Sequence, residues 1–324
     1  MIVDSQCHWF SRTLLDALLD LDEYPRCRRD GHGYAFEVAP GRFVPWGPRF
    51  TDLDSQLEMF AAAGVDAVIS SSGSFGDVDR LEPGRAGEVA HALNAERAAA
   101  EQANPGRFYG LATLPWQDTG AALAVLDEAV SNLGLRGVLI HSNINGAPID
   151  SDTCRPVYAR MAELGMPLFL HPTRSLAEAQ LRDYGLEYLV GFVFDTSLAA
   201  LRLVLSGIVA ENPGLEVVLP HCGGTLPYLA GRIDASHEKP YSLGAPLNPL
   251  PSEQLRSFYT DTVAQDADTL AFAGRFFAAG HVMFASDYPF FAVEQQLAFV
   301  RDLLPESDRA AVLGRNAEAL LRLA

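Results

Sequence analysis

The sequence predicts an α/β fold, a (β/α)8 TIM barrel in a single domain. Short runs rich in Val, Ile, Leu and Phe alternate with longer stretches of helical period that are rich in Ala and Leu, which is the pattern of repeated βα units. Eight such apolar runs occur in 324 residues, and eight βα pairs in a chain of this length favour one barrel over two ordinary domains. We therefore treat residues 1–324 as one domain.

The expected strands are apolar runs that end in polar residues or turn signals. They are Ile2–His8, Val65–Ser71, Arg107–Thr113, Arg136–His141, Pro167–His171, Leu215–His221, Phe258–Thr262 and His281–Asp287. Helical periodicity predicts the intervening helices, several of which are followed by Gly or Asn-Pro. These helices cover residues 87–103, 119–133, 151–164, 197–211 and 266–279, and an amphipathic helix over 313–323 closes the domain.

Residues 22–50 interrupt this rhythm. They contain Gly, Pro, Arg and aromatic residues without helical periodicity. We expect this segment to be an insertion after the first strand and helix, lying over the barrel mouth.

Charge and composition limit the classes of function. A formal net charge of −17 without a basic run argues against nucleic-acid or anionic-membrane partners, because phosphates require clustered Lys and Arg. The sequence contains no uninterrupted apolar run near the length of a membrane span, and it begins without a basic segment followed by a long apolar one. We expect a cytoplasmic protein with a small-molecule partner. Its four cysteines are widely spaced and are expected to be reduced thiols.

Polar residues that can bind metals follow four of the apolar runs. They are Gln6 and His8, His171, His221, and Asp287. In a parallel barrel the carboxyl ends of the strands converge on one face, so we expect these residues to form one active site.

A divalent metal site is expected at His8, His171 and Asp287, because imidazole nitrogen and carboxylate oxygen are standard ligands of such ions. Each residue alone is more simply explained as a hydrogen-bonded histidine or a helix-capping aspartate, but their joint placement at strand ends favours the metal site. Gln6 lies two residues before His8 and so shares its strand face. Its amide oxygen is a candidate fourth ligand, although a neutral ligand would weaken the site.

Two further histidines are candidates for contact with a substrate. His221 opens the sequence His-Cys-Gly-Gly and is expected to be a general acid or base, with a core histidine as the alternative. His141 ends a strand and is a candidate substrate-facing residue, in a polar loop that could equally be a lid or a turn.

Candidate binding groups for a carboxylate are Arg49 and Arg232, because guanidinium holds carboxylates through two parallel hydrogen bonds. Trp9, Trp46, Tyr184 and Phe290 could wall a ring-shaped ligand, with core packing as their alternative role.

These segments resemble the metal-dependent amidohydrolase superfamily, in particular the branch of aminocarboxymuconate-semialdehyde decarboxylase and related aromatic-acid decarboxylases. The motifs that carry the resemblance are Asp4-x-Gln6-x-His8, Leu170-His171-Pro172, His221-Cys222-Gly223-Gly224 and Ala285-Ser286-Asp287-Tyr288-Pro289-Phe290. One departure stands out, since Gln6 occupies the place of the family's usual His or Glu.

The resemblance implies zinc, or alternatively manganese, on His8, His171 and Asp287, with His221 acting on the substrate or on metal-bound water. It also implies a homodimer in which Arg232 reaches the neighbouring site, and it matches Arg49 to an arginine of the insertion. The expected function is a non-oxidative decarboxylase (carboxy-lyase) of an aromatic or muconate-like carboxylic acid. The alternatives are a metal-dependent hydrolase or hydratase of a lactone, ester or amide, and a metal-free binding protein on a degenerate barrel.

Overall fold

The computed structural model describes residues 1–31, 33–75, 78–239 and 246–323. Each of the eight expected strand segments contains a strand, and these strands run parallel to their neighbours. Their bounds are β1 Val3–His8, β5 Ala67–Ser71, β6 Phe108–Gly110, β7 Ala112–Thr113, β8 Val138–His141, β11 Leu168–His171, β12 Val217–Leu219, β13 Tyr259–Asp261 and β14 Val282–Met283. The segment 107–113 thus supplies two short strands.

The parallel strands form two hydrogen-bonded sets, in the orders β1-β5-β6 and β14-β13-β12-β11-β8-β7. Further backbone bonds connect β1 to the segment after β14, because Ser5 N donates to Phe284 O at 2.8 Å and Asp287 N donates to Gln6 O at 2.9 Å. The expected last strand, 281–287, is therefore shorter than predicted, and its second half pairs with β1 as an irregular extension. The strand sides that face inward are apolar and buried.

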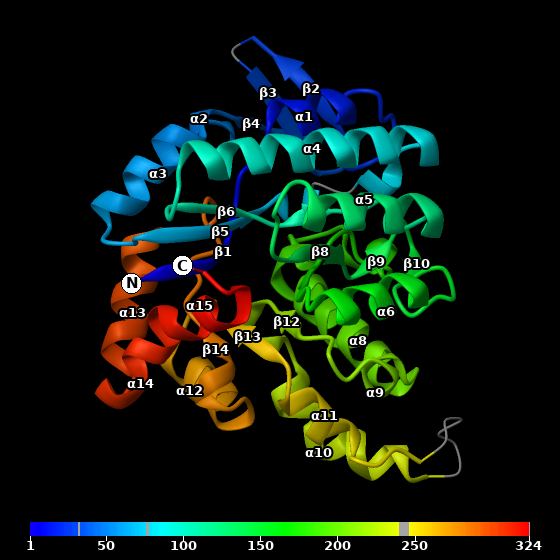
Figure 1. Cartoon of the computed structure of the whole chain (residues 1–324), viewed down its shortest axis with the longest axis vertical. Coiled ribbons are helices and arrows are strands. Elements are labelled where there is room, and N and C mark those ends of the chain that lie inside the picture. The colour runs from blue at the N-terminus through cyan, green and yellow to red at the C-terminus, as the bar shows by residue number, and fades with distance from the viewer. Residues whose placement is uncertain (32, 76–77, 240–245, 324) are drawn as a thin grey trace.

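Helices follow the strands and cover them on the outside, as Figure 1 shows for α4, α5 and α6. The helices are α1 Arg12–Leu18, α2 Pro48–Thr51, α3 Leu53–Ala62, α4 Pro83–Ala103, α5 Thr119–Ser131, α6 Arg155–Leu164, α7 Glu178–Leu181, α8 Phe192–Leu205, α9 Ile208–Glu211, α10 Leu226–His237, α11 Pro251–Arg256, α12 Ala267–Phe276, α13 Val293–Leu303, α14 Glu306–Ala310 and α15 Asn316–Leu321. Single turns of other helix types are η1 Gly73–Phe75, η2 Val78–Arg80, η3 Glu187–Gly191, η4 His221–Gly223, η5 Ala279–His281 and η6 Ala311–Arg315.

Several helix starts follow from local side-chain chemistry. Ser11, Asp118 and Asp266 each accept a hydrogen bond from a backbone N–H in the first turn of α1, α5 and α12, which satisfies a donor that the helix leaves unpaired. The expected helix over 197–211 instead begins at Phe192 and is interrupted before Ile208. The interruption lies at Gly207, whose φ of +84° is the left-handed conformation that glycine tolerates.

Residues 22–50 contain a three-stranded antiparallel sheet in the order β2-β3-β4, with β2 Cys27–Asp30, β3 Gly33–Ala39 and β4 Arg42–Trp46. This sheet lies at one end of the molecule, beyond α4 (Figure 1). Two further short strands, β9 Asn143–Ile144 and β10 Ala147–Pro148, pair after β8. The four cysteines are buried free thiols, as expected.

One helical stretch among the described residues, Glu187–Leu205, is long and apolar enough to cross a membrane by length and composition alone. The stretch is not an uninterrupted apolar run, because it contains Glu187, Asp195 and Arg202. The stretch combines η3 with α8, and 44% of its apolar window is buried inside the fold. Helix α8 packs against α11. The stretch carries the buried acids Glu187 and Asp195, whereas its apolar residues Leu189, Phe194 and Leu198 are exposed.

Candidate metal centre

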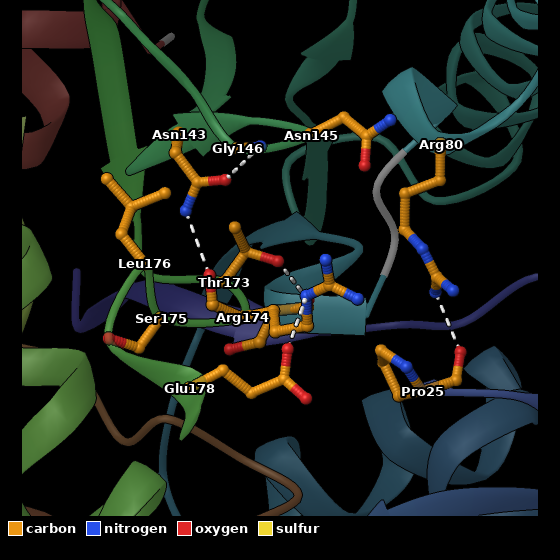
Figure 2. A pocket seen from close by; sticks show the side chains of 11 residues that line it. Pro25, Arg80, Asn143, Asn145, Gly146, Thr173, Arg174, Ser175, Leu176 and Glu178 are labelled. Atoms are coloured by element: carbon orange, nitrogen blue, oxygen red, sulfur yellow. Dashed lines mark hydrogen bonds and ion pairs between the residues drawn. The ribbon is translucent and has the colours of Figure 1, made fainter. Parts of the chain in front are cut away.

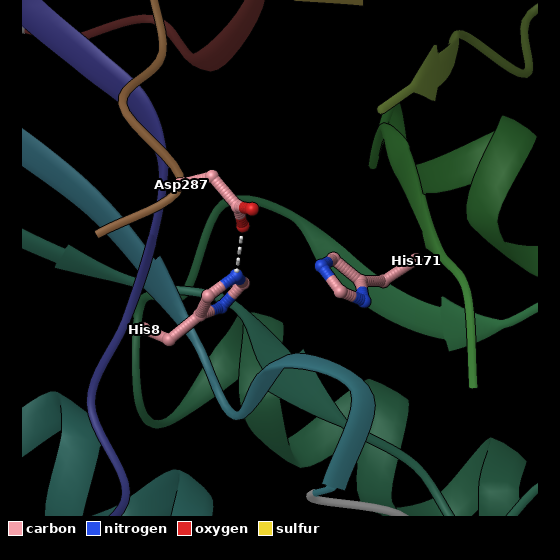
Figure 3. A group of neighbouring side chains, drawn as sticks. All are labelled: His8, His171 and Asp287. Atoms are coloured by element: carbon pink, nitrogen blue, oxygen red, sulfur yellow. Dashed lines mark hydrogen bonds and ion pairs between the residues drawn. The ribbon is translucent and has the colours of Figure 1, made fainter. Parts of the chain in front are cut away.

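The carboxyl ends of β1 and β11 and the loop after β14 bring His8, His171 and Asp287 together (Figure 3). All three are buried, and one ligand atom from each lies within 4.8 Å of the others. Nε2 of His8 is 2.9 Å from Oδ1 of Asp287. Two imidazoles and one carboxylate at these positions form a donor set that zinc and manganese accept.

His171 shows best that this cluster fits a cation. Its Nδ1 lies 2.9 Å from the carbonyl oxygen of Pro172, and a carbonyl only accepts, so Nδ1 carries the hydrogen. In the neutral ring Nε2 is then an acceptor, and it is buried without a hydrogen-bond partner among the described residues. Burial, together with the neighbouring histidines His8 and His221, holds the pKa of His171 well below its usual value. A buried acceptor without a donor is costly unless it meets a cation or a proton.

Asp287 is the negative charge of the cluster. Burial by itself would raise its pKa, but the nearby ring of His221 and the hydrogen bond from His8 hold the pKa well below its usual range. The residue has a φ of +57°, a left-handed conformation that is uncommon outside glycine and is often found at functional sites.

Gln6 belongs to the same cluster as predicted, but its amide nitrogen faces Asp287. Nε2 of Gln6 lies 3.2 Å from Oδ1 of Asp287 and 3.5 Å from Nε2 of His221. Rotating the amide by half a turn would present its oxygen to the cluster instead. Gln6 therefore remains a candidate further ligand.

His221 lies beside the three-residue cluster, with its Nε2 3.8 Å from Oδ2 of Asp287. Burial lowers the pKa of His221, but the nearby carboxylates of Asp287 and Asp261 outweigh burial and leave the pKa raised. Its Nδ1 is buried and has no hydrogen-bond partner among the described residues. This ring can therefore carry a proton next to a carboxylate.

The turn that carries His221 depends on close packing. Gly224 has a φ of +62°, and a Cβ there would lie 2.5 Å from the carbonyl oxygen of Val193 in α8. Asp261 fixes the same turn from β13, since its Oδ1 accepts hydrogen bonds from the backbone N–H groups of Cys222 and Val263 at 3.0 Å each. Sequence reasoning gave Asp261 no role, although it too lies at a strand end.

A cavity of about 480 Å³ opens over the cluster. Its polar end contains His171, His221 and Asp287, with Ser74 and Gln265 nearby. The remaining walls are mostly apolar, namely Val38, Trp46, Tyr188, Phe192, Val193, Val263, Phe290 and Phe291. Such a cavity suits a small ring that directs its polar groups at the cluster.

Of the aromatic residues considered from the sequence, Trp46 and Phe290 line this cavity. The other two have different positions. Trp9 donates its indole N–H to the carbonyl of Thr51 at 3.1 Å, and Tyr184 is 91% exposed.

The remaining predicted site residues, His141, Arg49 and Arg232, lie outside the lining of this cavity. His141 is buried, and its Nε2 is 2.9 Å from the carbonyl oxygen of Gly73. Arg49 donates to the carbonyl of Pro289, next to the cavity-lining Phe290. Arg232 is exposed on α10 beside the apolar residues Leu229 and Ile233. None of these three is among the described residues that line the cavity.

A smaller, polar cavity of about 200 Å³ adjoins the first and shares Ser74 with it. Figure 2 shows Arg80 and Arg174 on its walls, together with Asn143 and Asn145. Arg80 donates to the carbonyl of Pro25, and Arg174 donates to that of Tyr24, at 2.7 Å each. These arginines thus attach the segment before β2 to the loops after β5 and β11.

Comparison with known proteins agrees with this geometry. The amidohydrolase family model matches residues 3–323. The chain is 31% identical over 247 residues to the 2-amino-3-carboxymuconate-6-semialdehyde decarboxylase of Dictyostelium discoideum, covering 75% of this chain and 68% of that protein. The chain belongs to the amidohydrolase family. The resemblance stated from the sequence motifs is therefore confirmed.

Other relatives of this amidohydrolase are also carboxy-lyases. The chain is 30% identical to the 6-methylsalicylic acid decarboxylase of Penicillium expansum, with 89% of this chain and 90% of that protein covered. A solved dihydroxybenzoic acid decarboxylase from Polaromonas, with bound manganese and the inhibitor 2-nitroresorcinol, superposes with a TM-score of 0.81 at 25% identity over 99% of this chain and 97% of that one.

Proposed function

We propose that this amidohydrolase is a metal-dependent, non-oxidative decarboxylase of an aromatic or muconate-like carboxylic acid. The observation that carries the proposal is the cavity, whose aromatic walls end at the cluster of His171, His221 and Asp287. A flat ring fits between such walls, and its carboxylate would then meet the polar end. The named relatives, all decarboxylases of carboxylic acids, support the same chemistry.

The metal would be held by His8, His171 and Asp287, with the amide oxygen of Gln6 as a further ligand. When bound, the ion would supply positive charge that anchors the substrate's oxygens. We propose zinc or manganese. Manganese is the ion bound in the Polaromonas decarboxylase, and imidazole and carboxylate ligands suit both ions.

Decarboxylation of a ring requires a proton on the carbon that carries the carboxylate. We assign the delivery of this proton to His221, because it lines the cavity beside Asp287 without belonging to the three-residue cluster. The imidazolium transfers its proton to that carbon. The bond to the carboxylate then breaks, its electron pair returns to the ring, and carbon dioxide leaves. Asp287, at 3.8 Å, stabilises the imidazolium before the transfer.

The fold and assembly complete the proposal. The eight strand segments are proposed to close into a (β/α)8 barrel, which is supported by the hydrogen bonds between β1 and the segment after β14. Residues 22–50 are proposed as an insertion over its mouth, since Val38 and Trp46 of this segment line the cavity.

We also propose a cytoplasmic homodimer. Its exposed Arg232 would bind a substrate carboxylate in the neighbouring subunit. Arg49 would assist substrate binding through the carbonyl of Pro289, and His141 through the loop at Gly73.

Release of carbon dioxide tests the function. The purified chain, loaded with Zn²⁺ or Mn²⁺, is offered 2,6-dihydroxybenzoate, 6-methylsalicylate and a panel of muconate-like acids, with simple lactones and esters in parallel. Metal-dependent release of carbon dioxide is the expected result. Acid release from lactones or esters without carbon dioxide would identify a hydrolase, and tight binding of acids without turnover or metal would identify a binding protein.

A further inference from the structure

We infer that Ser71, the last residue of β5, and Ser74, in the turn that follows, are positioning residues that orient the imidazoles of His8 and His171 from the side away from the proposed metal. The inference rests on the proposed metal site. It concerns two residues that are not proposed as metal ligands and that belong to none of the motifs named above. Polar residues at a strand end were the signal that identified His8 and His171, and the sequence Ser71-Ser72-Gly73-Ser74 carries the same signal.

Each serine contacts the imidazole nitrogen that faces away from the cluster. Oγ of Ser71 lies 3.2 Å from Nδ1 of His8, and Oγ of Ser74 lies 3.3 Å from Nδ1 of His171. The hydrogen on Nδ1 of His171 is shared with the carbonyl of Pro172 at 2.9 Å, so Ser74 is the second acceptor at this nitrogen. Both rings therefore direct Nε2 toward Asp287. A hydrogen bond at the far nitrogen of a histidine fixes its tautomer and the orientation of its ring, and thus aims the lone pair of the other nitrogen at the metal.

The loop is shaped to touch both rings at once. Gly73, between the two serines, has a φ of +55°, and a Cβ there would lie 3.0 Å from Cγ and Nδ1 of His8. Glycine is thus required both for the backbone conformation and for the close approach. The backbone N–H of Gly73 donates to Oγ of Ser71 at 3.3 Å, which holds that hydroxyl against His8.

A buried arginine holds the centre of the loop. Arg97 of α4 donates to the hydroxyl of Ser72, and also to the carbonyl of Leu111 at 2.8 Å and the hydroxyl of Thr113 at 2.6 Å. His141 supports the loop from the other side through its contact with the carbonyl of Gly73. Groups that are buried and bonded in this way cannot rearrange cheaply, so the serines are held in fixed positions.

The test measures metal affinity in the full-length chain, with Ser71→Ala and Ser74→Ala compared with wild type. The dissociation constant for Mn²⁺ is obtained by competition with a chelating indicator. Each variant is expected to bind Mn²⁺ about 10- to 100-fold more weakly. Ser5→Ala is the matched control, because Ser5 is also buried and its hydroxyl has no hydrogen-bond partner among the described residues. It should bind Mn²⁺ as wild type does.

Two further measurements separate positioning from general damage. The melting temperature of the metal-free variants should stay close to that of wild type, and the visible absorption of the Co²⁺-loaded chain should change in both Ala variants. Ser71→Thr and Ser74→Thr keep the hydroxyl and should recover most of the affinity even if the Ala variants fold poorly. Wild-type Mn²⁺ affinity in both folded Ala variants, or no recovery with Thr, would overturn the inference.

Failure of the proposed function gives a different result. If wild type binds Mn²⁺ but releases no carbon dioxide from any acid, the function fails while the affinities still test the serines. If wild type binds no Mn²⁺, the metal site itself is refuted, and the positioning role with it.

Discussion

The side-chain amide of Gln6 donates to Oδ1 of Asp287 at 3.2 Å, and the same oxygen lies 2.9 Å from Nε2 of His8. A neutral amide and an imidazole thus share one carboxylate oxygen. A ligand with a negative charge at position 6 would repel Asp287 in the metal-free chain and attract a cation more strongly. Because Gln6 is neutral, it adds no negative charge to that of Asp287.

Gln6→Glu is therefore expected to tighten Mn²⁺ binding at least about tenfold, because a second carboxylate at this distance strengthens attraction to a divalent cation. The same variant should melt at a lower temperature than wild type when metal is absent, since two carboxylates repel there. Chelator competition and thermal unfolding measure the two effects. Gln102→Glu, which adds the same charge at an exposed position of α4, should change neither. An unchanged Mn²⁺ affinity would place Gln6 outside the metal site.

Asp287→Asn should abolish turnover while the chain stays folded. The substitution keeps the shape of the side chain but removes the charge that faces His8 and His221. We expect a fall in the rate of carbon dioxide release of at least about 100-fold. Asp268→Asn, at an exposed position in the first turn of α12, is the control and should keep full activity. A folded, active Asp287→Asn chain would remove this carboxylate from the mechanism.

The role of Arg232 across a dimer can be tested by complementation. Arg232→Ala and Asp287→Asn chains are each expected to be inactive alone. If Arg232 serves the neighbouring site, mixed dimers contain one intact site, and an equal mixture should regain about a quarter of wild-type activity, because half of the dimers are mixed and each has one of two sites intact. Carbon dioxide release after mixing and re-equilibration of subunits measures this. If Arg232 serves its own site, no mixed dimer has an intact site and activity stays absent.

The clustering of His8, His171 and Asp287 could be predicted because each follows an apolar run, and parallel strands bring such positions together. His8, His171 and His221 lie at or just after strand ends, where the pattern indicated them. Asp287 lies four residues beyond β14, so the pattern located it although the strand itself is short. An apolar run indicates a buried strand, and the polar residue that follows the run marks where the strand ends.

The loops around the cluster were harder to predict. His141 has the same strand-end signal as His171, yet its ring meets the carbonyl of Gly73. The direction of a side chain at a strand end depends on the neighbouring loop, which periodicity does not describe.

The antiparallel sheet of residues 22–50 was missed for a related reason. In β3, four consecutive residues from Tyr34 to Glu37 are buried, so the alternation that indicates a strand is absent.

Glu37 explains how that sheet tolerates a buried carboxylate, and it leads to a prediction about pH. Its two oxygens accept hydrogen bonds from Nε and Nη2 of Arg26 at 2.7 and 2.9 Å, and Gly41 N donates at 2.6 Å. The hydrogen bonds from Arg26 lower the pKa of Glu37 in the folded chain, although burial opposes them. The ionised group therefore stabilises the fold above the ordinary pKa of Glu, and this contribution is lost as the pH falls through the lowered value.

Glu37→Gln should accordingly lower the melting temperature by about 2–4 °C at pH 7, and the difference from wild type should shrink toward pH 3. Thermal unfolding followed by circular dichroism between these pH values measures it. The control is Glu88→Gln, whose partner Arg85 lies one turn away on the exposed face of α4; exposed pairs contribute little, so this variant should melt like wild type throughout. An equal difference between Glu37→Gln and wild type at both ends of the range would mean that the charge of Glu37 does not support the sheet. Its hydrogen-bonding geometry alone would then account for the contact with Arg26.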